Sequence, residues 1–178
     1  MFSSKLTLFV STLVSLVAAT TTTTVVTGAA AAPTSVQDVL NSLKTTTDAI
    51  LPQIDALVAN KTATNTTVAP LLNQVISAVD TATSSIFSQG LAGSNNTNDL
   101  ATLASGIMKD INTSMQGVKN SGCHLDGLLA VIAVTLTKLL CTLEVVVPGL
   151  LKVVALLLKG VVGTVVVLLC GLLGVIIG

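Results

Sequence analysis

Apolar residues recur at helical spacing along the first part of the chain. The first series steps alternately by four and three positions, and six of its seven members are apolar: Val36, Leu40, Leu43, Thr47, Ile50, Ile54 and Leu57. This spacing places the series on one face of a helix. Ser35 followed by Asp38 resembles a capping box at the start of that helix. Pro52 lies inside the pattern and predicts a kink or break near Leu51.

Two further stretches show the same spacing. Their apolar positions are Val68, Leu72, Val75, Val79, Ala82 and Ile86, and then Leu100, Leu103, Ile107, Ile111 and Val118. The segments between the three series, 59–67 and 88–98, are rich in Asn, Thr, Gly and Ser, as linkers are. We therefore predict that residues 34–120 form a module of three amphipathic helices.

The chain changes character after the turn-forming cluster at 120–122. Of the 54 residues in 125–178, 37 are Ala, Val, Ile, Leu or Cys. Pro148-Gly149 breaks this stretch, which predicts an apolar helical hairpin over residues 123–178. The fold class expected from the whole pattern is all-α: a small bundle of amphipathic helices followed by that hairpin. The Val-rich stretch 161–169 leaves a β-structure as an alternative for part of the tail.

The hydrophobic tail carries few charges. If a helix continued through Pro148, Lys138, Lys152 and Lys159 would lie within ~60° of one another and form a thin polar stripe. A bundle built from the first half uses its apolar stripes for its own core. We therefore expect the tail to contact something else: itself, a second copy, a lipid phase or an air–water boundary.

The N-terminal residues have the pattern of a targeting segment. Lys5 is followed by a short apolar run and by small residues at 17–19, which predicts a secretory signal peptide over 1–19. Residues 20–33 form a Thr/Ala-rich leader. Four N-glycosylation sequons follow, at Asn60, Asn65, Asn95 and Asn112. Together these features predict a secreted glycoprotein located outside the cell or in the cell wall.

All three cysteines lie in the second half. A hairpin folded at Pro148-Gly149 brings Cys123 toward Cys170, so we favour a disulfide between them. Cys141 then remains as a buried apolar residue or as an intermolecular link. His124 follows Cys123, but two adjacent ligands without a second cluster do not make a metal site.

Composition excludes several classes of function. Charged residues make up 9% and aromatic residues 2% of the chain, and the formal net charge is zero. A nucleic-acid-binding protein needs a basic patch and stacking rings, so that class is not expected. No nucleophile elbow is present, and the aspartates of the first half are isolated from one another. We expect no enzymatic activity, no cofactor, no metal and no small-molecule substrate.

The layout resembles a group of secreted basidiomycete cell-wall proteins that have a hydrophilic first half and a hydrophobic second half. The first half, from Ser35 to Val118, is also loosely similar to fungal hydrophobic surface-binding protein A. The resemblance implies a hydrophobin-like structural role in aerial growth or attachment, with self-association and contact with hydrophobic surfaces, cell wall or lipid. The alternative from another class is a membrane-associated protein anchored by its apolar C-terminal half, and a third is a small-ligand binder that uses the tail as a lipid pocket.

Overall fold

The computed structural model describes residues 33–89 and 96–159, and within them it contains five α-helices and no strand. The all-α fold class is therefore confirmed, and the predicted hairpin over 123–178 is described only as far as residue 159. These residues belong to one compact unit, Ala32–Gly178. The helices are α1 (Val36–Ala59), α2 (Asn65–Gln89), α3 (Thr97–Asn120), α4 (Asp126–Val146) and α5 (Leu150–Leu158).

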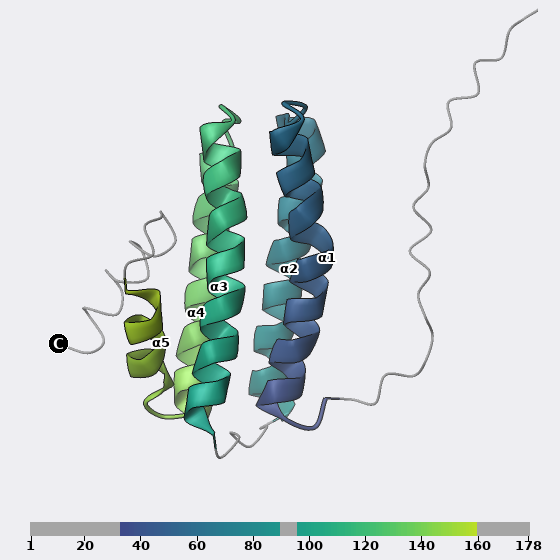
Figure 1. The fold of residues 1–178 in the computed structure, drawn as a ribbon. Coiled ribbons are helices and arrows are strands. Elements are labelled where there is room, and N and C mark those ends of the chain that lie inside the picture. Colours follow the sequence, from purple (N-terminus) through teal and green to yellow (C-terminus); the bar gives the residue numbers. More distant parts are fainter. Residues whose placement is uncertain (1–32, 90–95, 160–178) are drawn as a thin grey trace, which may run out of the picture. The chain divides into compact units, whose positions relative to one another are not determined.

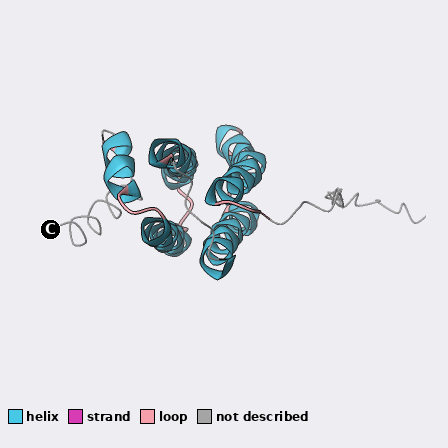
Figure 2. Ribbon diagram, turned by 90° about the horizontal axis from the view of Figure 1, so that it is seen from below, coloured by secondary structure: helices cyan, strands magenta, loops and turns pink. Residues whose placement is uncertain are grey.

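The four long helices lie side by side, and the short α5 lies beside α3 and α4 (Figure 1). Helix α1 contacts α2 and α3, and α4 contacts the same two helices from the other side. Viewed along the helix axes, the long helices form two pairs, with α5 outside one of them (Figure 2). The arrangement is a four-helix bundle with a fifth, short helix on its flank.

The start of α1 is fixed by the predicted cap. The Asp38 backbone N–H donates to the Ser35 hydroxyl at 3.1 Å, and the Ser35 hydroxyl donates to the Asp38 carboxylate at 2.8 Å. The Thr34 backbone N–H and hydroxyl also donate to this carboxylate. The hydrogen bonds from Ser35, and then those from Thr34, lower the pKa of Asp38 below its ordinary 3.8. The capping prediction is confirmed, with Asp38 in the position that Glu usually takes.

Of the predicted kink or break near Leu51, the break does not occur, because α1 continues through Pro52 to Ala59. Pro52 lies on the exposed side of the helix. The carbonyl that loses its helical partner there can bond to water instead. The buried face of α1 continues past the proline through Leu51 and Ile54, and this packing holds the helix together.

The predicted apolar stripes form the core. Nearly all of their members are buried, among them Leu40, Ile54, Leu72, Ile86, Leu100 and Ile111. Thr47, the one polar member of the first stripe, is buried as well. Its hydroxyl lies 3.1 Å from the Leu43 carbonyl and 2.9 Å from the Lys44 carbonyl, so burial leaves it hydrogen-bonded.

Helix α4 overturns the expectation that the bundle could not cover the tail. Helix α1 contacts both α2 and α3, but α2 and α3 make no contact with each other. The apolar faces of α2 and α3 are therefore not covered by each other on the side opposite α1, and α4 packs against them there. Its buried apolar residues are Leu129, Ile132, Ala133, Leu136, Leu139, Leu140 and Leu143. The first part of the hydrophobic half is thus part of the bundle's own core.

Candidate functional surfaces

The large apolar side chains that remain exposed are concentrated on α4 and α5. Among the described residues they are Val131, Val134 and Val145 on α4 and Leu156 and Leu157 on α5, with Phe87 of α2 as the exception. Val145 is 79% exposed and Leu156 is 64% exposed. We call these five α4 and α5 residues the α4–α5 apolar surface. These side chains make α4 and α5 the helices on which the large exposed aliphatic groups of the described residues occur.

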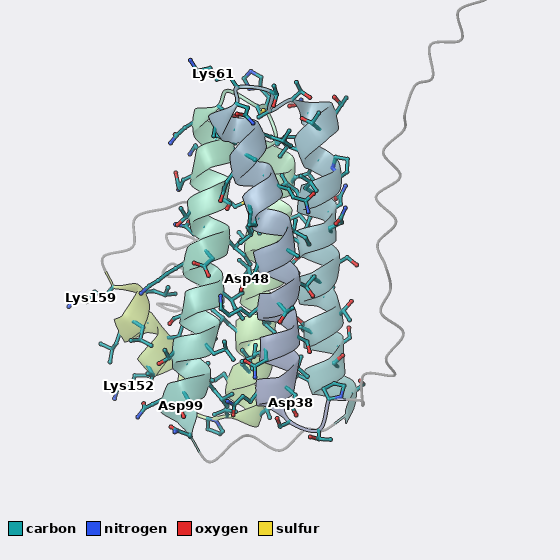
Figure 3. The ribbon with its side chains drawn as sticks, turned by 45° about the vertical axis from the view of Figure 1, so that its right-hand side comes forward. Asp38, Asp48, Lys61, Asp99, Lys152 and Lys159 are labelled. Atoms are coloured by element: carbon teal, nitrogen blue, oxygen red, sulfur yellow. The ribbon has the colours of Figure 1, made fainter. Side chains whose placement is uncertain are left out.

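Helices α1 to α3 present a different exterior. Asp38, Asp48 and Asp99 project from the outside of the bundle, as does Lys61 at its end (Figure 3). The described part of the molecule is therefore amphiphilic: most of its acidic and hydroxyl-bearing side chains lie on α1 to α3, and its large exposed aliphatic side chains lie on α4 and α5.

The three lysines of the tail are all exposed. They do not form the continuous stripe that the sequence predicts, because the helix ends at Val146 and a new helix starts at Leu150. Lys138 lies on α4, whereas Lys152 and Lys159 extend from the outer side of α5 (Figure 3). Long lysine side chains in this position keep their charge in water while their methylene groups can cover apolar surface.

Glu144, the one glutamate of the chain, holds α5 in place. One of its carboxylate oxygens accepts the backbone N–H of Gly149 at 2.8 Å, and the other accepts that of Leu151 at 2.8 Å. The side chain thus spans the turn between the two helices and caps the first turn of α5 with a negative charge. Gly149 has a positive φ of 87°, a conformation that glycine adopts at little cost.

The apolar segment 160–178 follows α5 directly and has no charged residue. It lies outside the described residues, and so do the predicted signal peptide 1–19, most of the leader 20–33, Asn95 and Cys170. Within the described residues, α4 is the one helix long and apolar enough to cross a membrane. Eight of its residues are buried in the bundle, which is also typical of a core helix.

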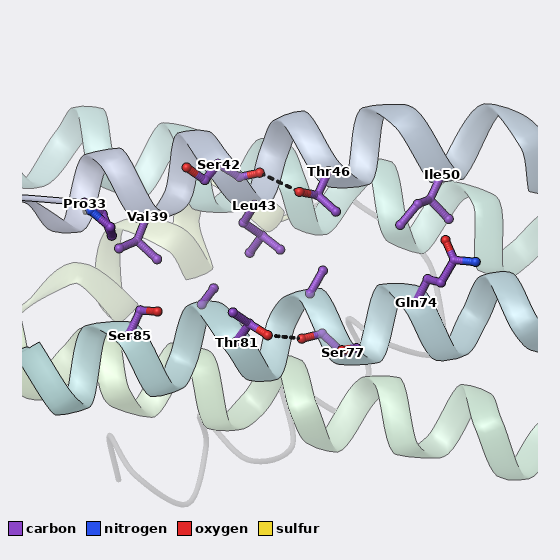
Figure 4. A pocket seen from close by; sticks show the side chains of 12 residues that line it. Pro33, Val39, Ser42, Leu43, Thr46, Ile50, Gln74, Ser77, Thr81 and Ser85 are labelled. Carbon is purple, nitrogen blue, oxygen red and sulfur yellow. Dashed lines mark hydrogen bonds between the residues drawn. The ribbon is translucent and has the colours of Figure 1, made fainter. Parts of the chain in front are cut away.

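A groove runs between α1 and α2 on the outside of the bundle, with a volume of about 540 Å³ (Figure 4). We call it the α1–α2 groove. Its floor consists of aliphatic side chains: Val39, Leu43 and Ile50 from α1 and Ala78 and Ala82 from α2. The hollow lies where α2 presents Ser, Ala and Thr side chains, with Gln74 at one end, opposite the branched side chains of α1. The volume falls within the range of small-molecule sites.

Hydroxyl groups line both edges of the groove: Ser42 and Thr46 on α1, and Ser77, Thr81 and Ser85 on α2. The Thr46 hydroxyl donates to the Ser42 carbonyl at 2.9 Å, and the Thr81 hydroxyl donates to the Ser77 carbonyl at 2.7 Å (Figure 4). Both threonine oxygens can therefore still accept a hydrogen bond but have already used their one donor. None of the twelve residues that line the groove is charged.

The charged groups near the middle of α1 are directed toward α3. The Lys44 ammonium lies 3.0 Å from the Asp48 carboxylate and 3.4 Å from that of Asp110 on α3. The hydrogen bond with Asp48 is the main cause that raises the pKa of Lys44 above its ordinary 10.5, and Asp110 adds to it. These side chains are partly exposed, so the cluster adds little to stability. It does leave the groove side of α1 uncharged.

The described sequons differ in their accessibility. Asn60, at the end of α1, and Asn65, at the start of α2, are exposed. Asn112 is only 2% exposed, and its side-chain oxygen has no hydrogen-bond partner. A glycan on Asn112 is incompatible with this packing, so the prediction for that residue is wrong for the folded chain. Exposure at Asn60 and Asn65 is compatible with the prediction but does not test whether they are modified.

Cys123 and Cys141 are both half-buried and are not joined to each other. The predicted partner of Cys123 lies outside the described residues, so that disulfide stays a prediction. Cys123 accepts a hydrogen bond from the Ser121 hydroxyl at 3.3 Å. No group of three His, Cys, Asp or Glu side chains suited to a metal ion occurs in the part of the chain that the structure describes.

The fold and surfaces define an all-α bundle with an amphiphilic exterior. A stretch of 51 residues is 51% identical to fruiting body differentiation protein 16 of Flammulina velutipes. This stretch covers 29% of the chain and 40% of that relative, and the similarity is consistent with a fungal protein. No family model matches the chain, and no solved structure matches it.

Two features of these surfaces were missed by sequence reasoning. The α1–α2 groove depends on which face of α2 lies opposite α1, although the repeated Ala, Ser and Thr at 77–85 show where a narrow side could occur. The role of Glu144 depends on how the turn folds. Its signal was a single carboxylate placed four residues before Pro148, close to the start of a new helix.

Proposed function

We propose that this chain is a secreted structural amphiphile of fungal developing tissue. In this proposal the α4–α5 apolar surface and the apolar segment 160–178 contact hydrophobic surfaces or the cell wall, and α1 to α3 face water. The relative of Flammulina velutipes bears the name of a fruiting body differentiation protein, which supports a role in development. The protein acts through adsorption and self-association, without catalysis.

One observation carries this proposal: the exposed large aliphatic residues of the described bundle lie almost entirely on the two helices that lead into segment 160–178. Burial of apolar area contributes about 25 cal/mol per Å². The exposed aliphatic residues of α4 and α5 and the uncharged residues that follow can therefore drive adsorption together, while the polar exterior of the other helices keeps the protein hydrated.

A membrane-associated protein is the second candidate, and the length and apolar character of α4 favour it. To span a bilayer, α4 would have to leave the bundle and expose the stripes of α2 and α3 that it covers. It would also carry Lys138 into the hydrocarbon layer, at a cost of about 2.5 to 3.5 kcal/mol near the centre. Adsorption through side chains that are already exposed needs neither step.

Fractionation of a culture of the native source tests the two candidates. The amphiphile is expected in medium and wall fractions and is released from membranes by carbonate, whereas an anchored protein stays in the carbonate-resistant pellet. The purified protein is then expected to lower the surface tension of water and to bind Teflon. Unchanged surface tension together with no binding to Teflon would rule out the amphiphile.

Paired variants test which surface adsorbs. A chain carrying Val134→Asp and Val145→Asp places two charges on the α4–α5 apolar surface without altering the buried core. We expect it to adsorb to Teflon several-fold more slowly than the wild type. The matched control is Phe87→Asp, because Phe87 is 80% exposed but lies on α2. If both variants adsorb to Teflon equally slowly, then adsorption depends on exposed apolar side chains anywhere on the protein and not on the α4–α5 apolar surface.

A further inference from the structure

We propose that the α1–α2 groove is a binding site for an uncharged single-chain aliphatic alcohol. The site is distinct from the α4–α5 apolar surface, because its lining residues come from Pro33, α1 and α2 and none of them belongs to α4 or α5. The groove would therefore bind a small molecule whether or not the α4–α5 apolar surface adsorbs as proposed above.

The floor of the groove suits an alkyl chain. Its five aliphatic side chains follow the helix axes from Val39 to Ile50, a distance of ~16 Å at 1.5 Å per residue. Val39, Leu43 and Ile50 each retain 3 to 5% exposure, whereas Leu40 and Ile54, which face the bundle interior, retain none. These three side chains of the α1 core therefore retain a small exposed area at the floor of the groove. A narrow and elongated apolar floor matches an extended chain better than a ring system.

The charge pattern selects a neutral ligand. No lining residue is charged, and the lysine of α1 is held by Asp48 and Asp110 on the side facing α3. A carboxylate or an ammonium in the groove would lose hydration without gaining a counter-charge. Charge complementarity thus favours an uncharged compound over a fatty acid anion of the same length.

The edges of the groove favour a polar end group that both donates and accepts hydrogen bonds, because serine hydroxyls and the Gln74 amide, which can donate, lie beside the two threonines. Thr46 and Thr81 have given their hydroxyl hydrogens to backbone carbonyls, so each offers only an acceptor to a ligand. A ligand that donates a hydrogen bond, such as an alcohol, satisfies these oxygens, whereas an alkane does not. The expected bound state has the chain on the aliphatic floor and the hydroxyl group at one edge.

Equilibrium dialysis with radiolabelled dodecanol, using the full-length purified protein, tests this site. We expect saturable binding of one molecule per chain, and weaker binding of dodecanoate at neutral pH. Ala82→Leu places a larger side chain on the floor of the groove. It should weaken dodecanol binding about tenfold, the effect of displacing roughly two methylenes from apolar contact. The matched control is Ala56→Leu, because Ala56 is an exposed alanine of α1 outside the groove.

A second variant tests the role of the threonine acceptor, and NMR spectra locate the bound alcohol. Thr81→Val removes one acceptor with little change of shape and should weaken dodecanol binding while leaving dodecane binding unchanged. Backbone amide NMR shifts should move along α1 and α2 as dodecanol is added, and circular dichroism verifies that each variant is folded. Absence of saturable binding, equal affinity for dodecanoate, or shifts confined to α4 and α5 would each overturn the proposal. Because these readouts are made in solution, they remain valid if the adsorption of the α4–α5 apolar surface fails its own test.

Discussion

Removal of the Glu144 carboxylate should release α5 while leaving the four-helix bundle folded. Helix α5 has only nine residues and is too short to be stable in isolation. It is held by four buried side chains, Leu150, Leu151, Val154 and Leu158, and by the two hydrogen bonds that Glu144 accepts. The variant Glu144→Ala removes both hydrogen bonds, and Glu144→Gln keeps one oxygen as an acceptor.

The size of the effect follows from these contacts. A hydrogen bond to a charged group contributes about 1.5 to 3 kcal/mol, and a half-buried site lies at the lower end of that range. Because water replaces part of what is lost, we expect Glu144→Ala to destabilise the docking of α5 by about 2 kcal/mol. This corresponds to roughly a thirtyfold rise in the local opening constant, since 1.4 kcal/mol is tenfold. Glu144→Gln should lose about half of this free energy.

Native-state hydrogen exchange measures this opening. Amides in α5 should lose protection by the expected factor in Glu144→Ala, whereas amides in α1 and α2 should keep theirs. The control is Asp80→Ala, which removes an exposed carboxylate from α2, a helix that does not contact α5. Unchanged protection of α5 in Glu144→Ala, or an equal loss in the control, would refute this role of the carboxylate.

Three other outcomes follow from the structure. Leu136→Ala in α4 should lower the free energy of unfolding of the whole bundle by about 3 kcal/mol, measured by urea denaturation, because this side chain is fully buried; loss confined to α4 would contradict its place in the core. The hydrogen bond from Ser35 is the main cause that lowers the pKa of Asp38 in the folded protein. The ionised carboxylate therefore contributes its full stabilisation above about pH 3.8, and this stabilisation is lost as the pH falls through the lowered pKa of the folded state. An NMR titration of its carboxyl carbon should show this lowered pKa, and Ser35→Ala should raise it toward the ordinary value. Peptide mapping of the protein from its native source should detect a glycan on Asn60 but not on Asn112, and a glycan on Asn112 would show that α3 packs differently.

The helices of the first half could be predicted because their apolar residues repeat at a spacing that only a helix places on one face. Their ends were also close: the linkers expected at 59–67 and 88–98 enclose the observed ends of α1 and α2 and the start of α3. The place of α4 could not be predicted in the same way. Its sequence is apolar on nearly every side, so periodicity does not show which face is buried or which stripes it covers.

The buried sequon at Asn112 shows a second limit. The motif marks Asn112 as a glycan acceptor, while its spacing of four from Met108 and three from Met115 places it on the same helix face as two buried side chains. The second signal was available in the sequence, and the packing of α3 follows it. The sequence around Asn112 fits both a glycan acceptor and a core position of the helix, and the packing of the bundle places Asn112 in the core.

Hydrogen exchange of the adsorbed protein shows which helices contact a hydrophobic surface. The purified protein is bound to Teflon particles, exchanged in deuterated buffer, and compared peptide by peptide with the protein in solution. We expect added protection in peptides from α4, α5 and the residues that follow, with α1 to α3 exchanging as they do in solution. Protection gained mainly on α1 to α3, or loss of protection throughout the bundle, would contradict adsorption of a folded amphiphile through its α4–α5 apolar surface.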